Sequence, residues 1–268
     1  MPQIRELNEF AIYIPCAGHS LNLVGVKAAE CGPQIVSFFD FVQSLHSFYL
    51  ASTHRWNVLT SSFVKNYIVV KCLSDTRWSA HFDAVTALHG GFEKIQDALD
   101  ALVVDADHEW NTRREAEGLS KKMEKLETIF LTILWNDILE RVNKTSKILQ
   151  SQDVDILVAI DLLKSLKAYL REMRDTFSEY EAKAKSRCPD LKYSDGDKRA
   201  RKRSVRLTRY DGSAEQILLH ESEKFKLETY LPILHSHLTK RAEAFESIGN
   251  LFSFFSQLKT IDCNELSQ

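Results

Sequence analysis

Apolar side chains recur at helical spacing along most of this chain. In residues 34–50 they fall three or four positions apart and many are aromatic, which predicts a buried helix. The same spacing predicts further helices over residues 16–31, 53–67, 74–90, 92–104, 119–149 and 221–258. Gly32 with Pro33, and the pair Gly90 and Gly91, are expected to end the helices before them, because glycine supplies a left-handed cap and proline cannot continue a helix.

Two short apolar segments have the pattern of β-strands instead. Residues 10–14 (FAIYI) and 68–73 (IVVKCL) are rich in β-branched and aromatic side chains. After residue 92 no further strand signal occurs, so the rest of the chain is expected to form a helical bundle. Residues 104–117 are charged and are expected to connect two of its helices, and Pro232 is expected to kink or start a helix.

Two series of apolar residues repeat every seven positions in the middle of the chain. One series is Ile156, Leu163, Leu170 and Phe177, and the other is Ala159, Leu166, Met173 and Tyr180. Three heptads fit either a coiled-coil seam or a long bundle helix. Because the chain is apolar elsewhere, the bundle helix is the favoured interpretation.

The composition is that of a globular protein with one or two domains. The 268 residues are 44% hydrophobic and 27% charged, with only 9 Gly and 5 Pro, which favours a mainly α fold. The net charge of −2 argues against a protein that coats nucleic acid over its whole surface. Five unevenly spaced cysteines indicate a reducing compartment, the cytosol or the nucleus, and no apolar run is long enough to cross a membrane.

Positive charge is concentrated in one segment that is predicted to be a linker, residues 188–212. Seven basic residues and no acidic one fall within positions 198–209: Lys198, Arg199, Arg201, Lys202, Arg203, Arg206 and Arg209. Removing +7 from −2 leaves −9 for the rest of the chain. A solvated loop, a nuclear-import signal and a phosphate-contacting segment all fit this pattern.

Cys16 and His19 form a Cys-x-x-His pair at the start of the first predicted helix. Their spacing places a thiol and an imidazole on one helical face, where they could share a metal, a polar ligand or a phosphate. A structural zinc site needs four ligands, and the other cysteines provide no second closely spaced pair. A half-buried structural helix is therefore the simpler interpretation of the pair alone.

Four motifs together resemble the hAT-superfamily transposase domain, in the lineage of zinc finger MYM-type 1-like and DUF4371-containing proteins. They are CAGHSLNLVG from Cys16, THRWNVL from Thr53, LSDTRWSAHFDAV from Leu73, and the closing stretch from Glu228 to Lys259. The resemblance covers nearly the whole chain and is weakest in the basic segment. It implies a fragment of an RNase H-like core with one or two short strands, interrupted by a large helical insertion.

On this resemblance the chain divides into four parts. Residues 1–90 would be the partial RNase H-like core with the CxxH and TRW motifs, and residues 91–186 the helical insertion bundle. Residues 187–212 would be the basic linker, and residues 213–268 the last long helix or helices of the insertion.

The resemblance also implies the chemistry of the family, which is metal-assisted cleavage and transfer of DNA strands. Two aspartates and a glutamate hold divalent ions such as Mg²⁺ or Mn²⁺ in such enzymes. The positions of these acids are expected to lie before and after this sequence, so we expect no cofactor, no metal site and no catalytic residue here. Asp75, beside the TRW motif, is interpreted as a helix cap rather than a metal ligand.

The resemblance assigns a nucleic-acid contact to each of several residues. His19 and Arg77 would contact phosphate, and Trp78 would stack on a displaced base, although Trp78 also fits a core position at a helix start. Further phosphate contacts are expected from the basic segment, through Lys198, Arg199, Arg201, Lys202, Arg203 and Arg206.

Three hypotheses for function follow. The first is an inactive transposase-derived module that binds DNA or a protein partner in the nucleus. The second is a piece of an active transposase whose catalytic acids lie outside this chain. The third is a helical interaction protein, nuclear or cytoplasmic, that binds a partner or a second copy of itself through an exposed apolar face.

Overall fold

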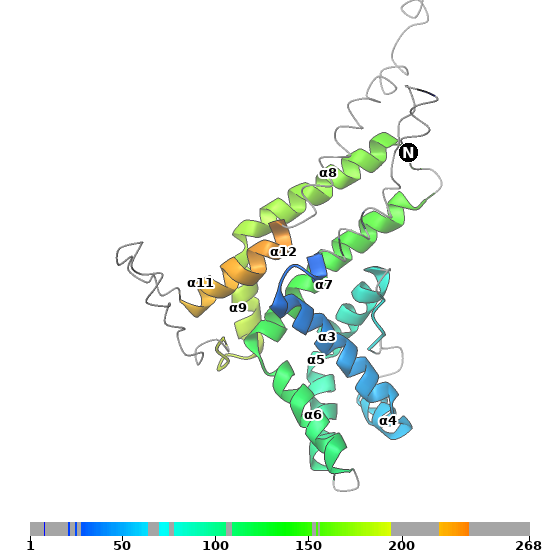
Figure 1. Ribbon diagram of the computed structural model, residues 1–268, viewed down its shortest axis with the longest axis vertical. Coiled ribbons are helices and arrows are strands. Elements are labelled where there is room, and N and C mark those ends of the chain that lie inside the picture. The colour runs from blue at the N-terminus through cyan, green and yellow to red at the C-terminus, as the bar shows by residue number, and fades with distance from the viewer. Residues whose placement is uncertain are drawn as a thin grey trace, which may run out of the picture.

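The computed structural model describes residues 8, 21, 25, 28–63, 70–74, 78–105, 109–151, 154, 156–193 and 220–235. This part of the chain is mainly helical, as expected, and contains no strand (Figure 1). The predicted strand 10–14 lies outside the described residues. The predicted strand 68–73 is wrong in its described part, because residues 70–73 form no strand. Their Val70 side chain is buried, and Gln43 accepts a hydrogen bond from the backbone N–H of Leu73 at 2.9 Å.

The first helices largely follow the hydrophobic pattern. Helix α3 (Pro33–Leu50) confirms the predicted aromatic helix and begins at the proline, where a missing N–H costs nothing. Helix α4 (Thr53–Ser61) is shorter than predicted. Helix α5 (Trp78–Val104) runs straight through the Gly90 and Gly91 pair, so the predicted break there is wrong.

Two further boundaries differ from the sequence-based expectation. Helix α6 (Trp110–Met123) occupies much of the stretch that was expected to be a connection. The single helix predicted over residues 119–149 is instead divided at Glu124 and Lys125, after which α7 (Leu126–Leu149) begins. The apolar period continues across this turn, and for that reason the pattern gave no sign of it.

The heptad region forms bundle helices. Helix α8 (Ile156–Glu172) returns beside α7, as Figure 1 shows, and the two pack together. A short 3₁₀ turn, η1 (Met173–Asp175), and Thr176 separate α8 from α9 (Phe177–Arg187), so the heptads do not form one uninterrupted helix. The heptad side chains from Leu163 to Tyr180 are buried in the protein's own core, which supports the bundle interpretation.

The described end of the chain is a helical run beside α9 and the start of α3. It consists of α11 (Glu221–Phe225), a π-helical turn η3 (Lys226–Tyr230), and α12 (Leu231–His235). Pro232 lies inside this run rather than at its start. Proline cannot donate to the carbonyl four residues before it, and the wider π turn falls just where that bond would be lost.

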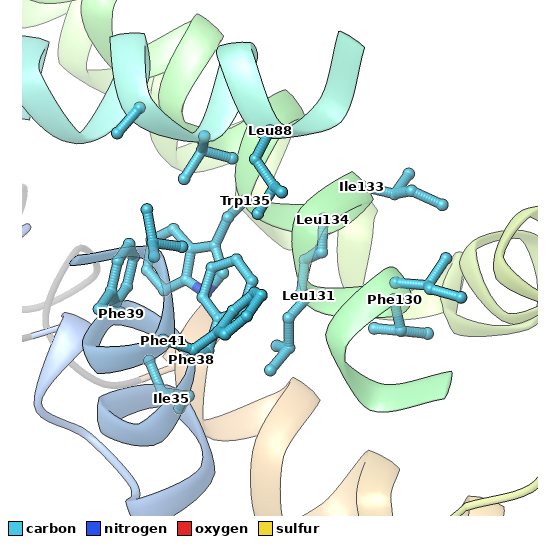
Figure 2. Close-up of a cluster of buried hydrophobic side chains, with 14 of the residues drawn as sticks. Ile35, Phe38, Phe39, Phe41, Leu88, Phe130, Leu131, Ile133, Leu134 and Trp135 are labelled. Atoms are coloured by element: carbon cyan, nitrogen blue, oxygen red, sulfur yellow. The ribbon is translucent and has the colours of Figure 1, made fainter. Parts of the chain in front are cut away.

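One hydrophobic core joins these helices. Figure 2 shows Trp135 of α7 between the aromatic side chains of α3 and Leu88 of α5. A second group of rings surrounds Phe130, whose centroid lies 5.4 Å from that of Phe177 and 5.0 Å from that of Phe225. The core therefore ties the C-terminal helical run to α7 and α9.

Candidate nucleic-acid interface

Trp78, the described member of the TRW motif, lies in the core and not on the surface. Its side chain is 3% exposed. Its ring stacks on His81 at 4.6 Å and on Trp135 at 5.9 Å between centroids, and the ring of Phe39 meets it edge-on at 6.4 Å. A nucleotide base would reach this indole only if the cluster opened. The arrangement is the one expected for a core residue at a helix start.

Gly25 also packs closely against the Trp78 ring. A Cβ atom added at Gly25 would overlap the indole ring of Trp78. Glycine is the one residue that leaves room for so close an approach of backbone and ring. Gly25, the last residue of the CAGHSLNLVG motif, therefore lies against Trp78 of the TRW motif.

The other residues with an expected nucleic-acid contact lie outside the described residues: His19, Arg77, Lys198, Arg199, Arg201, Lys202, Arg203 and Arg206. The motif residue Cys16 and Asp75 lie outside them as well. The contacts expected of them stay predictions. The described residues do show where the chain enters and leaves the basic segment.

Both flanks of the basic segment are held by one carboxylate, that of Glu181 on α9. The Tyr193 hydroxyl donates to Glu181 Oε1 at 3.0 Å, and the Ser222 hydroxyl donates to the same oxygen at 2.8 Å. Lys185 Nζ lies 3.1 Å from that oxygen as well. The described residues on either side of the basic segment, Tyr193 and Ser222, thus share one acceptor, and we call this cluster the Glu181 anchor.

The electrostatics of the Glu181 anchor favour the ionised carboxylate. Burial alone would raise the pKa of Glu181, but hydrogen bonds from Ser222, Lys185 and Tyr193 outweigh it and lower the pKa. Burial, with the charge of Glu181 beside it, raises the pKa of the Tyr193 hydroxyl. Around neutral pH the Glu181 carboxylate therefore stays charged, and the Tyr193 hydroxyl that donates to it stays protonated.

Aromatic packing also attaches the Glu181 anchor to the hydrophobic core. The ring of Tyr193 lies 5.2 Å from that of Phe225, and Phe225 contacts Phe130 edge-on at 5.0 Å. The anchor is therefore attached to α7 and not only to α9. No sequence signal indicated this anchor, because Tyr193 and Ser222 lie 12 and 41 residues from Glu181 and follow no helical or strand period.

The described residues contain no group of three or more His, Cys, Asp or Glu side chains that could hold a metal ion. Within that same part of the chain, no helix is both long and apolar enough to cross a membrane. Comparisons with protein-family models, with curated proteins and with solved structures found no match to this chain. The hAT resemblance therefore depends on the sequence motifs alone.

Proposed function

We propose that this chain is a hAT-transposase-derived helical module that binds nucleic acid in the nucleus through its basic segment, residues 198–209, without cleaving it. The observation that carries the proposal is the concentration of +7 in a segment whose two flanks meet at the Glu181 anchor. A segment held at both ends loses less conformational freedom on binding than a free tail does. The hAT motifs support nucleic acid as the ligand.

The test is binding of the purified chain to duplex and single-stranded DNA over a series of salt concentrations. Each phosphate contact makes the negative slope of log K against log[salt] steeper by about 0.9 for duplex DNA and about 0.7 for single strands. The triple variant Arg201→Ala, Lys202→Ala, Arg203→Ala should therefore make the duplex slope less steep by about 2 to 3 units and weaken binding at low salt.

The matched control removes three exposed lysines elsewhere, Lys144, Lys147 and Lys164 on α7 and α8. Its net charge change equals that of the triple variant. If the two variants lose the same slope, only overall charge matters and the basic segment is not the binding site. If the folded wild-type chain does not bind at all, the proposal fails.

A second function, self-association, is favoured by three exposed apolar side chains, at the ends of α3 and α5 and at the start of α6. Leu50, Val104 and Trp110 are 64%, 79% and 63% exposed, and Arg114 lies over the Trp110 ring at 5.2 Å. Tryptophan and arginine dominate protein interfaces energetically. Sedimentation velocity would detect a dimer that Trp110→Ala weakens and that Leu227→Ala, an exposed change elsewhere, leaves intact.

A further inference from the structure

A groove of about 280 Å³ lies between the first turn of α3 and the turn that joins α6 to α7. Its floor is apolar, with Phe38, Phe41 and Leu131 buried beneath it. The side chains of Lys122 and Lys125 line it and are exposed, and Glu127 also lines it. An apolar floor beside two ammonium groups suits a ligand that carries both a negative charge and a flat or aliphatic part.

The positive charge of this groove is available for a ligand. Lys121, one residue before Lys122, is occupied by an ion pair with Glu117 at 2.5 Å. No ion pair of Lys122 or Lys125 occurs within the described residues, and neither lysine makes a hydrogen bond there through its ammonium group. Two of the three neighbouring lysines are thus left to face the groove.

Two helices begin at this groove, and both beginnings add to its attraction for an anion. Gly32 at the start of α3 and Lys125 at the start of α7 provide no side-chain cap for the first amides. Uncapped amides and the helix dipole favour negative charge at such a point. Glu127 in the first turn of α7 opposes this effect on one side.

The groove lies near described residues on both sides of the basic segment. On the α3 wall, Gln34 Oε1 accepts a hydrogen bond of 2.5 Å from Thr229 of η3, in the run that follows the segment. On the α7 wall, Glu127 is close enough to Tyr193, which precedes the segment, for its charge to help raise that hydroxyl's pKa. The groove therefore adjoins the place where the basic segment is held.

We propose that this groove is a phosphodiester-binding site on the helical body, formed by described residues alone. Lys122 and Lys125 bind the phosphate of a nucleic-acid strand, and the apolar floor packs against its sugar or base. The inference rests on the proposed nucleic-acid binding, which it extends from the segment to a second, folded surface.

The test compares Lys122→Ala, Lys125→Ala with the control Lys144→Ala, Lys147→Ala, in the full chain and over a salt series on duplex DNA. The charge change is equal in both. The groove variant should have a salt slope that is less steep by about 1 to 2 units, and the control should keep the wild-type slope. Lys122→Arg, Lys125→Arg should also keep that slope, because arginine still binds phosphate.

The outcomes separate this inference from the proposed function. A groove variant that matches its control, while Arg201→Ala, Lys202→Ala, Arg203→Ala loses slope, overturns the groove and leaves the segment as the binding site. A folded wild-type chain that binds neither duplex nor single strands overturns both. If the groove variant has a lower melting temperature, binding is compared at a temperature at which all variants are fully folded.

Discussion

The sequence allows two interpretations of Trp78: a base-stacking residue at the surface, or a core residue at the start of a helix. A base-stacking tryptophan must present a free face to solvent, whereas Trp78 is covered by His81 and Trp135. An indole of this size contributes several kcal/mol through burial, about 3 to 5 by the usual cost of its removal. Trp78 is therefore best understood as a residue that positions the start of α5.

The contact between Gly25 and Trp78 yields a matched pair of glycine substitutions. Gly25→Ala should destabilise the protein by about 1 to 3 kcal/mol, because the new methyl group overlaps an indole that neighbouring rings hold in place. Gly118→Ala, in the helix α6 with no atom within 4 Å of the new Cβ, should stabilise it by about 1 kcal/mol. Urea unfolding followed by circular dichroism measures both free energies.

A neutral Gly25→Ala would contradict the close packing of that glycine against the ring. The Gly118 variant controls for the general preference of helices for alanine. Because that preference acts in the opposite direction, a destabilised Gly25 variant cannot be attributed to it.

At the scale of helices, a histidine and an arginine connect α5 to α9. The guanidinium of Arg187 can only donate, so His89 Nε2, 3.0 Å away, accepts its hydrogen bond and must be neutral. Burial lowers the pKa of His89, the charge of Arg187 lowers it further, and the charge of Asp137 partly opposes both. The folded state therefore resists protonation of this ring more than the unfolded chain does.

This lowered pKa predicts a loss of stability in mild acid. As the pH falls below the ordinary histidine pKa of 6.5, His89 binds a proton in the unfolded chain but less readily in the folded protein. The free energy of unfolding therefore decreases. The effect should not exceed about 1 kcal/mol, since the pair is partly solvated. His89→Gln, which keeps an acceptor but does not titrate, should have a smaller stability difference between about pH 8 and pH 5.

An equal pH dependence of the unfolding free energy in wild type and His89→Gln would show that other groups cause it.

The boundaries of the helices show what periodicity can and cannot predict. The apolar spacing of α3 and of the heptad region is enough to predict helices, because a repeated apolar face must be buried. Prediction of helix ends fails at Gly90 and Gly91. Each glycine costs about 1 kcal/mol in a helix, but the packing of α5 against α6 and α7 exceeds that cost. It fails again at Glu124, where a turn leaves the apolar period unchanged.

Of the candidate interface, the sequence predicts the basic segment but not the Glu181 anchor or the groove. A run of basic residues is visible in any sequence, so the segment 198–209 could be singled out. The Glu181 anchor and the groove beside Lys122 depend on side chains that meet only when distant helices pack. No local pattern encodes those meetings.

For the molecule as a whole, the Glu181 anchor should couple the stability of the helical body to nucleic-acid binding. Glu181→Ala removes the acceptor shared by Tyr193 and Ser222, so the flanks of the basic segment become freer and binding must order them again. Affinity for DNA should fall by about two- to tenfold, up to about 1.4 kcal/mol. The salt slope should not change, because the number of phosphate contacts is the same.

Two further variants make this prediction specific. Glu179→Ala removes the same charge from an exposed position two residues away on α9 and should leave the affinity close to that of the wild type. Glu181→Gln keeps an oxygen that can accept both hydroxyl hydrogen bonds and should bind with intermediate affinity. A Glu181→Ala variant that binds DNA as tightly as Glu179→Ala would mean that holding the two flanks together contributes nothing to recognition. A changed slope would mean instead that the anchor decides which basic residues reach the phosphates.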